Sequence, residues 1–170
     1  MKRRIQWIPV LVLLLLPLVA ACGLNRFGAD AWSGVTIEGD VLYVASGEGR
    51  VTALDISGDA EGGRGNPARI WGPYPSNNED ELGPVYGAPV LGAFAGDGLT
   101  GKTSVFVATY QDPEDDDDIE ANLFAIDSTT GTRNWAAPVP GQVVGSPTLI
   151  GNTLVVSTTD GFLYALTLEA

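Results

Sequence analysis

The chain has 170 residues and a formal net charge of −12 at pH 7, and it contains no histidine and a single cysteine. The lack of histidine excludes a Ser-His-Asp triad and most zinc sites, and the acidic surface excludes nucleic-acid binding. One cysteine cannot form an intrachain disulfide, so the fold has to be stabilised by packing.

Residues 1–21 are predicted to be a lipoprotein signal peptide. Three basic residues near the start precede an almost wholly apolar run, 8–18, that is short and broken by prolines. The run leads into Val19-Ala-Ala-Cys22, which resembles a bacterial lipobox. The resemblance implies cleavage before Cys22 and lipid attachment to it; the alternative is a spare thiol. Cleavage moves the net charge from −12 to −15, because Lys2, Arg3 and Arg4 are removed.

Lipidation implies anchoring at the extracytoplasmic face of a bacterial membrane. Several acyl chains hold a protein durably, whereas one chain binds reversibly. Residues 22–31 are expected to form a tether between the lipid and the first strand. The residue after Cys22 is Gly23 and not the aspartate of the enteric retention signal, and the choice between inner and outer membrane stays open.

The rest of the chain is predicted to be all-β, in three repeated units of about 32–74, 84–138 and 139–170. Glycines and prolines are spread throughout, and no helical period persists. In the first unit, Val41–Val44 and Arg50–Ala53 read as strands around a glycine turn. A glycine-rich insertion, 58–65, and Trp71 follow.

The second and third units repeat this pattern. A small residue, an aliphatic residue and a polar residue end a strand-like run in each unit, and the first residues of these triplets are Ala53, Ala125 and Ala165. In the third unit Thr153–Ser157 and Phe162–Ala165 flank an Asp-Gly turn. Units of several short strands with an aromatic residue at a fixed place are typical of propeller blades.

The second unit carries a motif that is shared with a known family. Ala125, Asp127, Thr130, Gly131 and Trp135 match Ala-x-Asp-x-x-Thr-Gly-x-x-x-Trp, so the chain resembles the pyrroloquinoline-quinone (PQQ)-like β-propeller repeat family. The resemblance implies that the tryptophan packs between neighbouring blades, while the aspartate and threonine tighten the turn before it.

The same motif is interpreted as structural, with no cofactor site. A wide indole adds apolar contact at a blade joint, Gly131 permits a turn conformation, and Ala125 leaves room for close approach. Trp135 is therefore expected to be a buried wedge. The predicted fold is a partial propeller of about three blades with an incomplete last blade, behind the signal peptide.

The incomplete last blade predicts a poor monomer. The run Phe162–Leu166 would be an apolar edge strand with open hydrogen-bonding groups. We expect either that further blades of a larger propeller complete it, that copies of the chain self-associate, or that a partner supplies the missing blades.

Residues 112–120 form an acidic run with two interpretations. Clustered carboxylates can hold Ca²⁺, but the run lacks the alternating ligands and central glycine of an EF-hand loop. Blocks of like charge usually remain solvated. We expect a solvated loop, and Ca²⁺ binding is the alternative.

The function expected from these features is a non-catalytic, lipid-anchored scaffold that binds other proteins of the cell envelope. The resembled family includes a lipoprotein of the outer-membrane barrel-assembly machinery that has both a lipobox and these repeats. The alternatives are part of a quinone-dependent dehydrogenase, which needs a full ring of blades around its cofactor, and a small-ligand sensor.

Overall fold

The computed structural model describes residues 33–58, 67–75, 82–94, 102–111 and 120–168. The predicted signal peptide, the tether with Cys22, most of the 58–65 insertion and residues 112–119 of the acidic run lie outside these ranges. All of the described strands lie in one compact unit, Ala31–Ala170.

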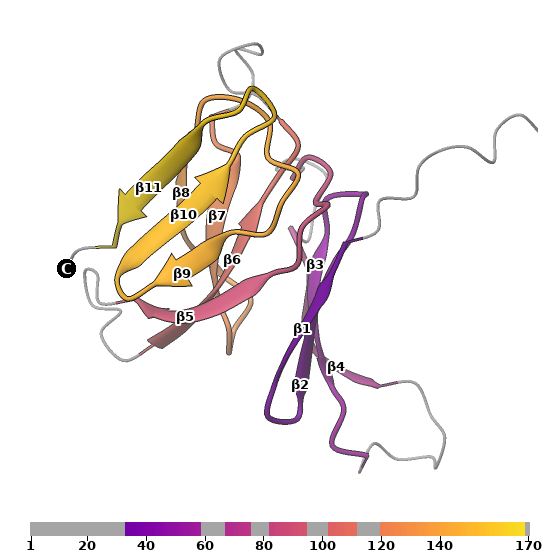
Figure 1. The fold of residues 1–170 in the computed structure, drawn as a ribbon. Coiled ribbons are helices and arrows are strands. Elements are labelled where there is room, and N and C mark those ends of the chain that lie inside the picture. Colours follow the sequence, from indigo (N-terminus) through magenta and orange to yellow (C-terminus); the bar gives the residue numbers. More distant parts are fainter. Residues whose placement is uncertain (1–32, 59–66, 76–81, 95–101, 112–119, 169–170) are drawn as a thin grey trace, which may run out of the picture. The chain divides into compact units, whose positions relative to one another are not determined.

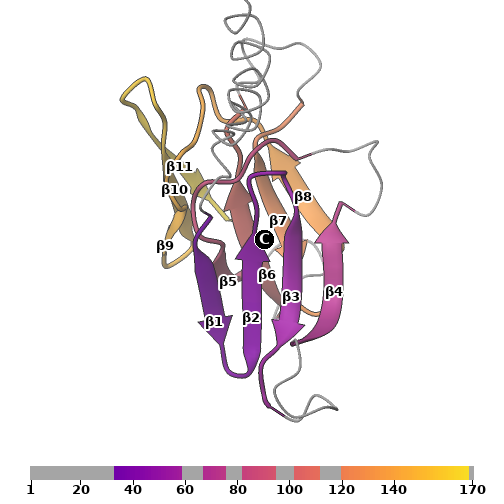
Figure 2. The ribbon, with the colours of Figure 1, turned by 90° about the vertical axis from the view of Figure 1, so that its right-hand side faces the viewer.

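The described strands form three antiparallel sheets, which we call blades 1, 2 and 3 (Figure 1). Blades 1 and 2 have the orders β1-β2-β3-β4 and β5-β6-β7-β8, and blade 3 has the order β11-β10-β9. Figure 2 shows the four strands of blade 1 side by side. The predicted all-β fold, a partial propeller of three blades, is confirmed. The strands are β1 Val35–Glu38, β2 Val41–Ala45, β3 Val51–Asp55, β4 Ala68–Tyr74, β5 Val90–Phe94, β6 Lys102–Ala108, β7 Leu123–Asp127, β8 Arg133–Ala137, β9 Thr148–Ile150, β10 Thr153–Ser157 and β11 Leu163–Thr167.

The same cross-strand row recurs on one face of each blade. This row contains the alanine of the sequence repeat, so we call this side of a blade its alanine face. In blades 1 and 2 the row ends in a tryptophan on the fourth strand, and in both blades a register shift follows the alanine. The rows are Tyr43-Ala53-Trp71, Phe106-Ala125-Trp135 and Val155-Ala165.

The opposite side of each blade carries a second recurring row, made of branched aliphatic residues, and we call it the aliphatic face. Side chains alternate between the two sides of a strand, so each blade has one face of each kind. The aliphatic rows are Ile37-Leu42-Leu54, Leu91-Val105-Ile126 and Leu149-Leu154-Leu166.

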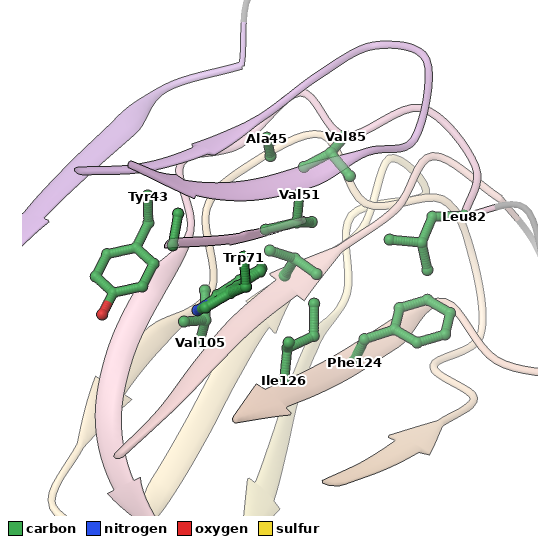
Figure 3. Packing of buried hydrophobic residues seen from close by; sticks show 11 residues of the cluster. Tyr43, Ala45, Val51, Trp71, Leu82, Val85, Val105, Phe124 and Ile126 are labelled. Carbon is green, nitrogen blue, oxygen red and sulfur yellow. The ribbon is translucent and has the colours of Figure 1, made fainter. Parts of the chain in front are cut away.

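The blades meet by packing an alanine face on an aliphatic face. One hydrophobic cluster joins the alanine face of blade 1 to the aliphatic face of blade 2, and Figure 3 shows most of its side chains. A second cluster joins the alanine face of blade 2 to the aliphatic face of blade 3. Blade 2 is covered on both sides, which is why all five residues of β7 are buried.

Candidate functional site

The motif of blade 2 builds a closed turn between β7 and β8. Asp127 Oδ1 accepts hydrogen bonds from the amides of Thr129 and Thr130, at 2.9 Å each. The amide of Gly131 donates to the carbonyl of Asp127 at 2.9 Å, and Gly131 has a φ of 73°. The hydroxyls of Thr130 and Thr132 lie 2.8 Å apart. A carboxylate with two backbone amides on one oxygen is an Asx-turn cap, so Asp127 fixes the shape of the turn.

This turn is the docking site for the tryptophan of the preceding blade. Trp71, on β4 of blade 1, donates from Nε1 to the carbonyl of Ser128 at 2.7 Å. Its indole lies on Gly131, where an added Cβ would be 2.6 Å from Trp71 Cε3. Trp71 is 7% exposed. The indole of Trp71 and its hydrogen bond thus contribute to the attachment of blade 1 to blade 2.

Tyr43 supports the docked indole from the neighbouring strand. The rings of Tyr43 and Trp71 have centroids 6.1 Å apart with an interplanar angle of 47°. The Tyr43 hydroxyl also donates to the carbonyl of Ser128, at 3.5 Å. Burial raises the pKa of Tyr43 above its ordinary value, which favours the protonated phenol.

Trp135 occupies the equivalent strand position in blade 2, but it is only partly buried and not the fully buried wedge expected from the sequence. It pairs with Ala125, which has no exposed surface, and its ring lies 6.0 Å from that of Phe106 at an angle of 47°. Trp135 packs on the buried cluster that includes Leu154 and Val156 of blade 3. Its side chain therefore contributes to the contact between blades 2 and 3.

Asn122, which the sequence did not single out, links blade 2 to the segment that leads to blade 3. Its side chain has no exposed surface. Nδ2 donates to the carbonyls of Gln111, Val139 and Gly141 at 3.0, 2.8 and 2.9 Å, and Oδ1 accepts from the amide of Val139 at 2.7 Å. Its partners are 11 to 19 residues away in the sequence, which is why no local pattern indicated it.

The family model described as "Outer membrane protein assembly factor BamB" matches residues 68–170, more than half of the chain. This chain belongs to that family. The matched residues include β4 with Trp71, the Asp127 turn and all of blades 2 and 3. The resemblance to PQQ-like repeats predicted from the sequence is confirmed.

Solved structures share the blade fold at low identity. BamB from Moraxella catarrhalis aligns with 79% of this chain at 17% identity and a TM-score of 0.48. A europium-containing methanol dehydrogenase aligns with 83% at 19% identity and a TM-score of 0.50. The chain spans 32% of the first structure and 24% of the second. No curated protein matches the chain in sequence.

Asp127 and Asp55 each use a carboxylate oxygen within their own turn. One carboxylate oxygen of Asp127 is used by its own turn, and Asp55 Oδ1 likewise accepts from the amide of Ser57 at 2.8 Å. The hydrogen bond from Ser57 lowers the pKa of Asp55. Among the described residues, no three carboxylate or thiol groups gather as metal ligands.

The other candidate sites lie outside the described residues. These are the predicted lipid attachment residue Cys22 and residues 112–119 of the acidic run. In the described part of the chain there is no helix with the length and apolar composition needed to cross a membrane.

Proposed function

We propose that this chain is an exported lipoprotein, anchored through Cys22 to the extracytoplasmic face of a bacterial membrane, that acts as a non-catalytic interaction scaffold of the cell envelope. In this proposal residues 1–21 are the signal peptide, 22–31 the tether and 32–170 the repeats. Support for the envelope setting comes from the family, whose model is named for an outer membrane assembly factor, and from the lipobox-like Val19-Ala-Ala-Cys22.

One observation carries the scaffold role. The motif of the repeat is structural. Asp127 and Gly131 shape the turn, and the tryptophans lie at the joints between blades. This leaves the exposed surface of the blades as the surface that we propose for binding other proteins. We propose other envelope proteins or further propeller blades as the partners.

Replacing the lipidated residue tests the envelope role. The Cys22→Ser chain should lose incorporation of labelled palmitate and should leave the membrane fraction, because lipoprotein processing needs the thiol. Gly23→Ala is the matched control and should keep both properties. An unchanged mass and unchanged membrane association of the Cys22→Ser chain would refute the anchor.

The second candidate is part of a PQQ-dependent dehydrogenase, with a small-ligand sensor as a further alternative. This candidate is compatible with the fold shared with the europium-containing methanol dehydrogenase, a likeness that at 19% identity concerns the fold and not the activity. Dye-linked alcohol oxidation in the presence of added quinone and Ca²⁺ separates the candidates: a scaffold shows none.

A further inference from the structure

The segment that leads from blade 1 into blade 2 is held at one end of the sheets by two backbone hydrogen bonds. The amide of Val85, in this segment, donates to the carbonyl of Ser46, in the turn between β2 and β3, at 3.3 Å. The carbonyl of Pro84 accepts from the amide of Tyr110, in the loop between β6 and β7, at 2.7 Å. We call the end of the blades that carries these turns the loop end; the β2–β3 turn lies at the top of blade 1 in Figure 2.

The segment that leads from blade 2 into blade 3 repeats both bonds. The amide of Val143 donates to the carbonyl of Thr109 at 3.3 Å. The carbonyl of Gln142 accepts from the amide of Thr159 at 2.9 Å. All of these donors and acceptors are backbone groups, so the framework of the loop end does not depend on the side chains at these positions.

Two tyrosines occupy places in this framework that are not aromatic in its second copy. Tyr110 corresponds to Thr159, and Tyr86, which follows Val85, corresponds to Val144. The two tyrosine rings form an edge-to-face pair, with centroids 5.3 Å apart and an interplanar angle of 83°. Tyr110 is 36% exposed and Tyr86 is half-buried. The repeat framework therefore does not explain why an exposed aromatic pair stands here.

The described loops at this end carry more acidic than basic side chains. Glu48 in the β2–β3 turn, Glu120 in the β6–β7 loop and Asp160 in the β10–β11 turn are all exposed. Arg50 is the basic residue of these described loops, and its Nη1 donates to the carbonyl of Pro75 at 2.6 Å. The chain as a whole has a net charge of −12. A surface of this sign attracts cationic partners and repels acidic ones.

We propose that the Tyr86–Tyr110 pair is a docking site for an arginine-rich segment of a partner protein, with a guanidinium group lying on the tyrosine rings. A cation within about 6 Å of a ring centroid is attracted by the electrons of the ring face, and arginine makes this contact more often than lysine. Tyrosine suits an interface because its ring is apolar and its hydroxyl remains wet. The inference rests on the proposed scaffold role and names the chemistry of one partner.

Fluorescence anisotropy with a labelled triarginine peptide tests this docking on the full chain, purified in detergent. We expect Tyr86→Leu and Tyr110→Leu each to weaken binding about threefold, because each removes a ring and leaves the charge of the protein unchanged. Tyr110→Phe keeps the ring and should keep the affinity. A peptide with citrulline in place of arginine has a similar shape without the charge, and it should not bind.

Two matched controls locate the effect. Phe162→Leu removes another exposed ring at the loop end, in the turn between β10 and β11, and should leave the affinity unchanged. Glu120→Gln should weaken binding more than Asp40→Asn, which removes the same charge from the β1–β2 turn at the opposite end of blade 1, because charges beyond about 8 Å are screened at physiological salt. If a leucine variant does not fold, this pair of charge variants decides.

The proposal is overturned if the unchanged chain does not bind the arginine peptide, if the folded leucine variants bind it as tightly as the unchanged chain, or if the citrulline peptide binds equally well. Failure of this docking can be told apart from failure of the scaffold role. A palmitate-labelled, membrane-bound chain that does not bind the arginine peptide loses this docking site alone, whereas an unlabelled soluble chain loses the proposed envelope function.

Discussion

A glycine is needed at position 131 both for the conformation of the turn and for the docking of blade 1 on blade 2. Its φ of 73° is a left-handed conformation that side chains rarely adopt, and its bare Cα face is covered by the indole of Trp71. The first requirement follows from the turn motif in the sequence. The second involves a residue 60 positions earlier, on another blade, and only the structure shows it.

Substitution of Gly131 by alanine should destabilise the fold more than the same change at Gly151. Both glycines have positive φ, 73° and 59°, so both variants lose about 1–2 kcal/mol from left-handed strain. At Gly151 an added Cβ meets no atom within 4 Å, whereas at Gly131 it would displace Trp71. Urea unfolding midpoints measure the difference. Equal shifts of the two midpoints would show that the contact between Trp71 and Gly131 does not stabilise the fold.

The role of Ser128 as a hydrogen-bond acceptor could not be predicted from the sequence. The motif identified Asp127, Thr130 and Gly131, because side chains that cap turns leave a sequence pattern. Ser128 accepts hydrogen bonds from Trp71 and Tyr43 through its backbone carbonyl. Any residue at this position presents that carbonyl, so no residue type could have indicated it.

At the scale of elements, β7 and the segment that follows β8 are held by one buried side chain. Asn122 precedes β7, and its amide connects Gln111, in the segment after β6, with the segment from Val139 to Gly141. When a buried polar group loses its hydrogen-bond partner, the free energy of unfolding decreases. Asn122 therefore sets the course of the chain from blade 2 into blade 3.

Asn122→Ala should lower the free energy of unfolding by about 3 kcal/mol or more, because several buried backbone groups lose a partner at about 1–3 kcal/mol each. Asn134→Ala is the matched control: Asn134 is half-buried and donates once, to Ser104 Oγ at 2.9 Å. Its loss should cost about 1 kcal/mol. Chemical unfolding of both variants compares them, and similar costs would show that Asn122 is not the main link.

The strands themselves were predictable, and the pairing of the first tryptophan was less so. The runs at Val41–Val44 and Thr153–Ser157 lie within β2 and β10, because β-branched residues beside glycine turns favour hairpins. A long insertion separates Asp55 from Trp71 in the sequence. The register nevertheless pairs Trp71 with Ala53, as Trp135 pairs with Ala125, since cross-strand packing tolerates long loops.

The three described blades stack with one polarity. Each described joint places an alanine face on an aliphatic face, so the first and last described blades present complementary faces. The sequence predicted an apolar edge strand, Phe162–Leu166, in the last blade. It did not indicate which residues line the blade faces, because that depends on the strand register, in which Ile37 of blade 1 corresponds to Leu149 of blade 3.

Light scattering on the delipidated mature chain, residues 22–170 with Cys22→Ser, tests the central claim that this is an interaction module with open blade faces. We expect an apparent mass that rises with protein concentration, and that returns to the monomer mass when Ile37→Asp and Ile150→Asp are combined. Both side chains are more than half exposed, so the double variant should keep its unfolding midpoint. A monodisperse, cooperatively folding monomer at every concentration, without the aspartates, would contradict the account.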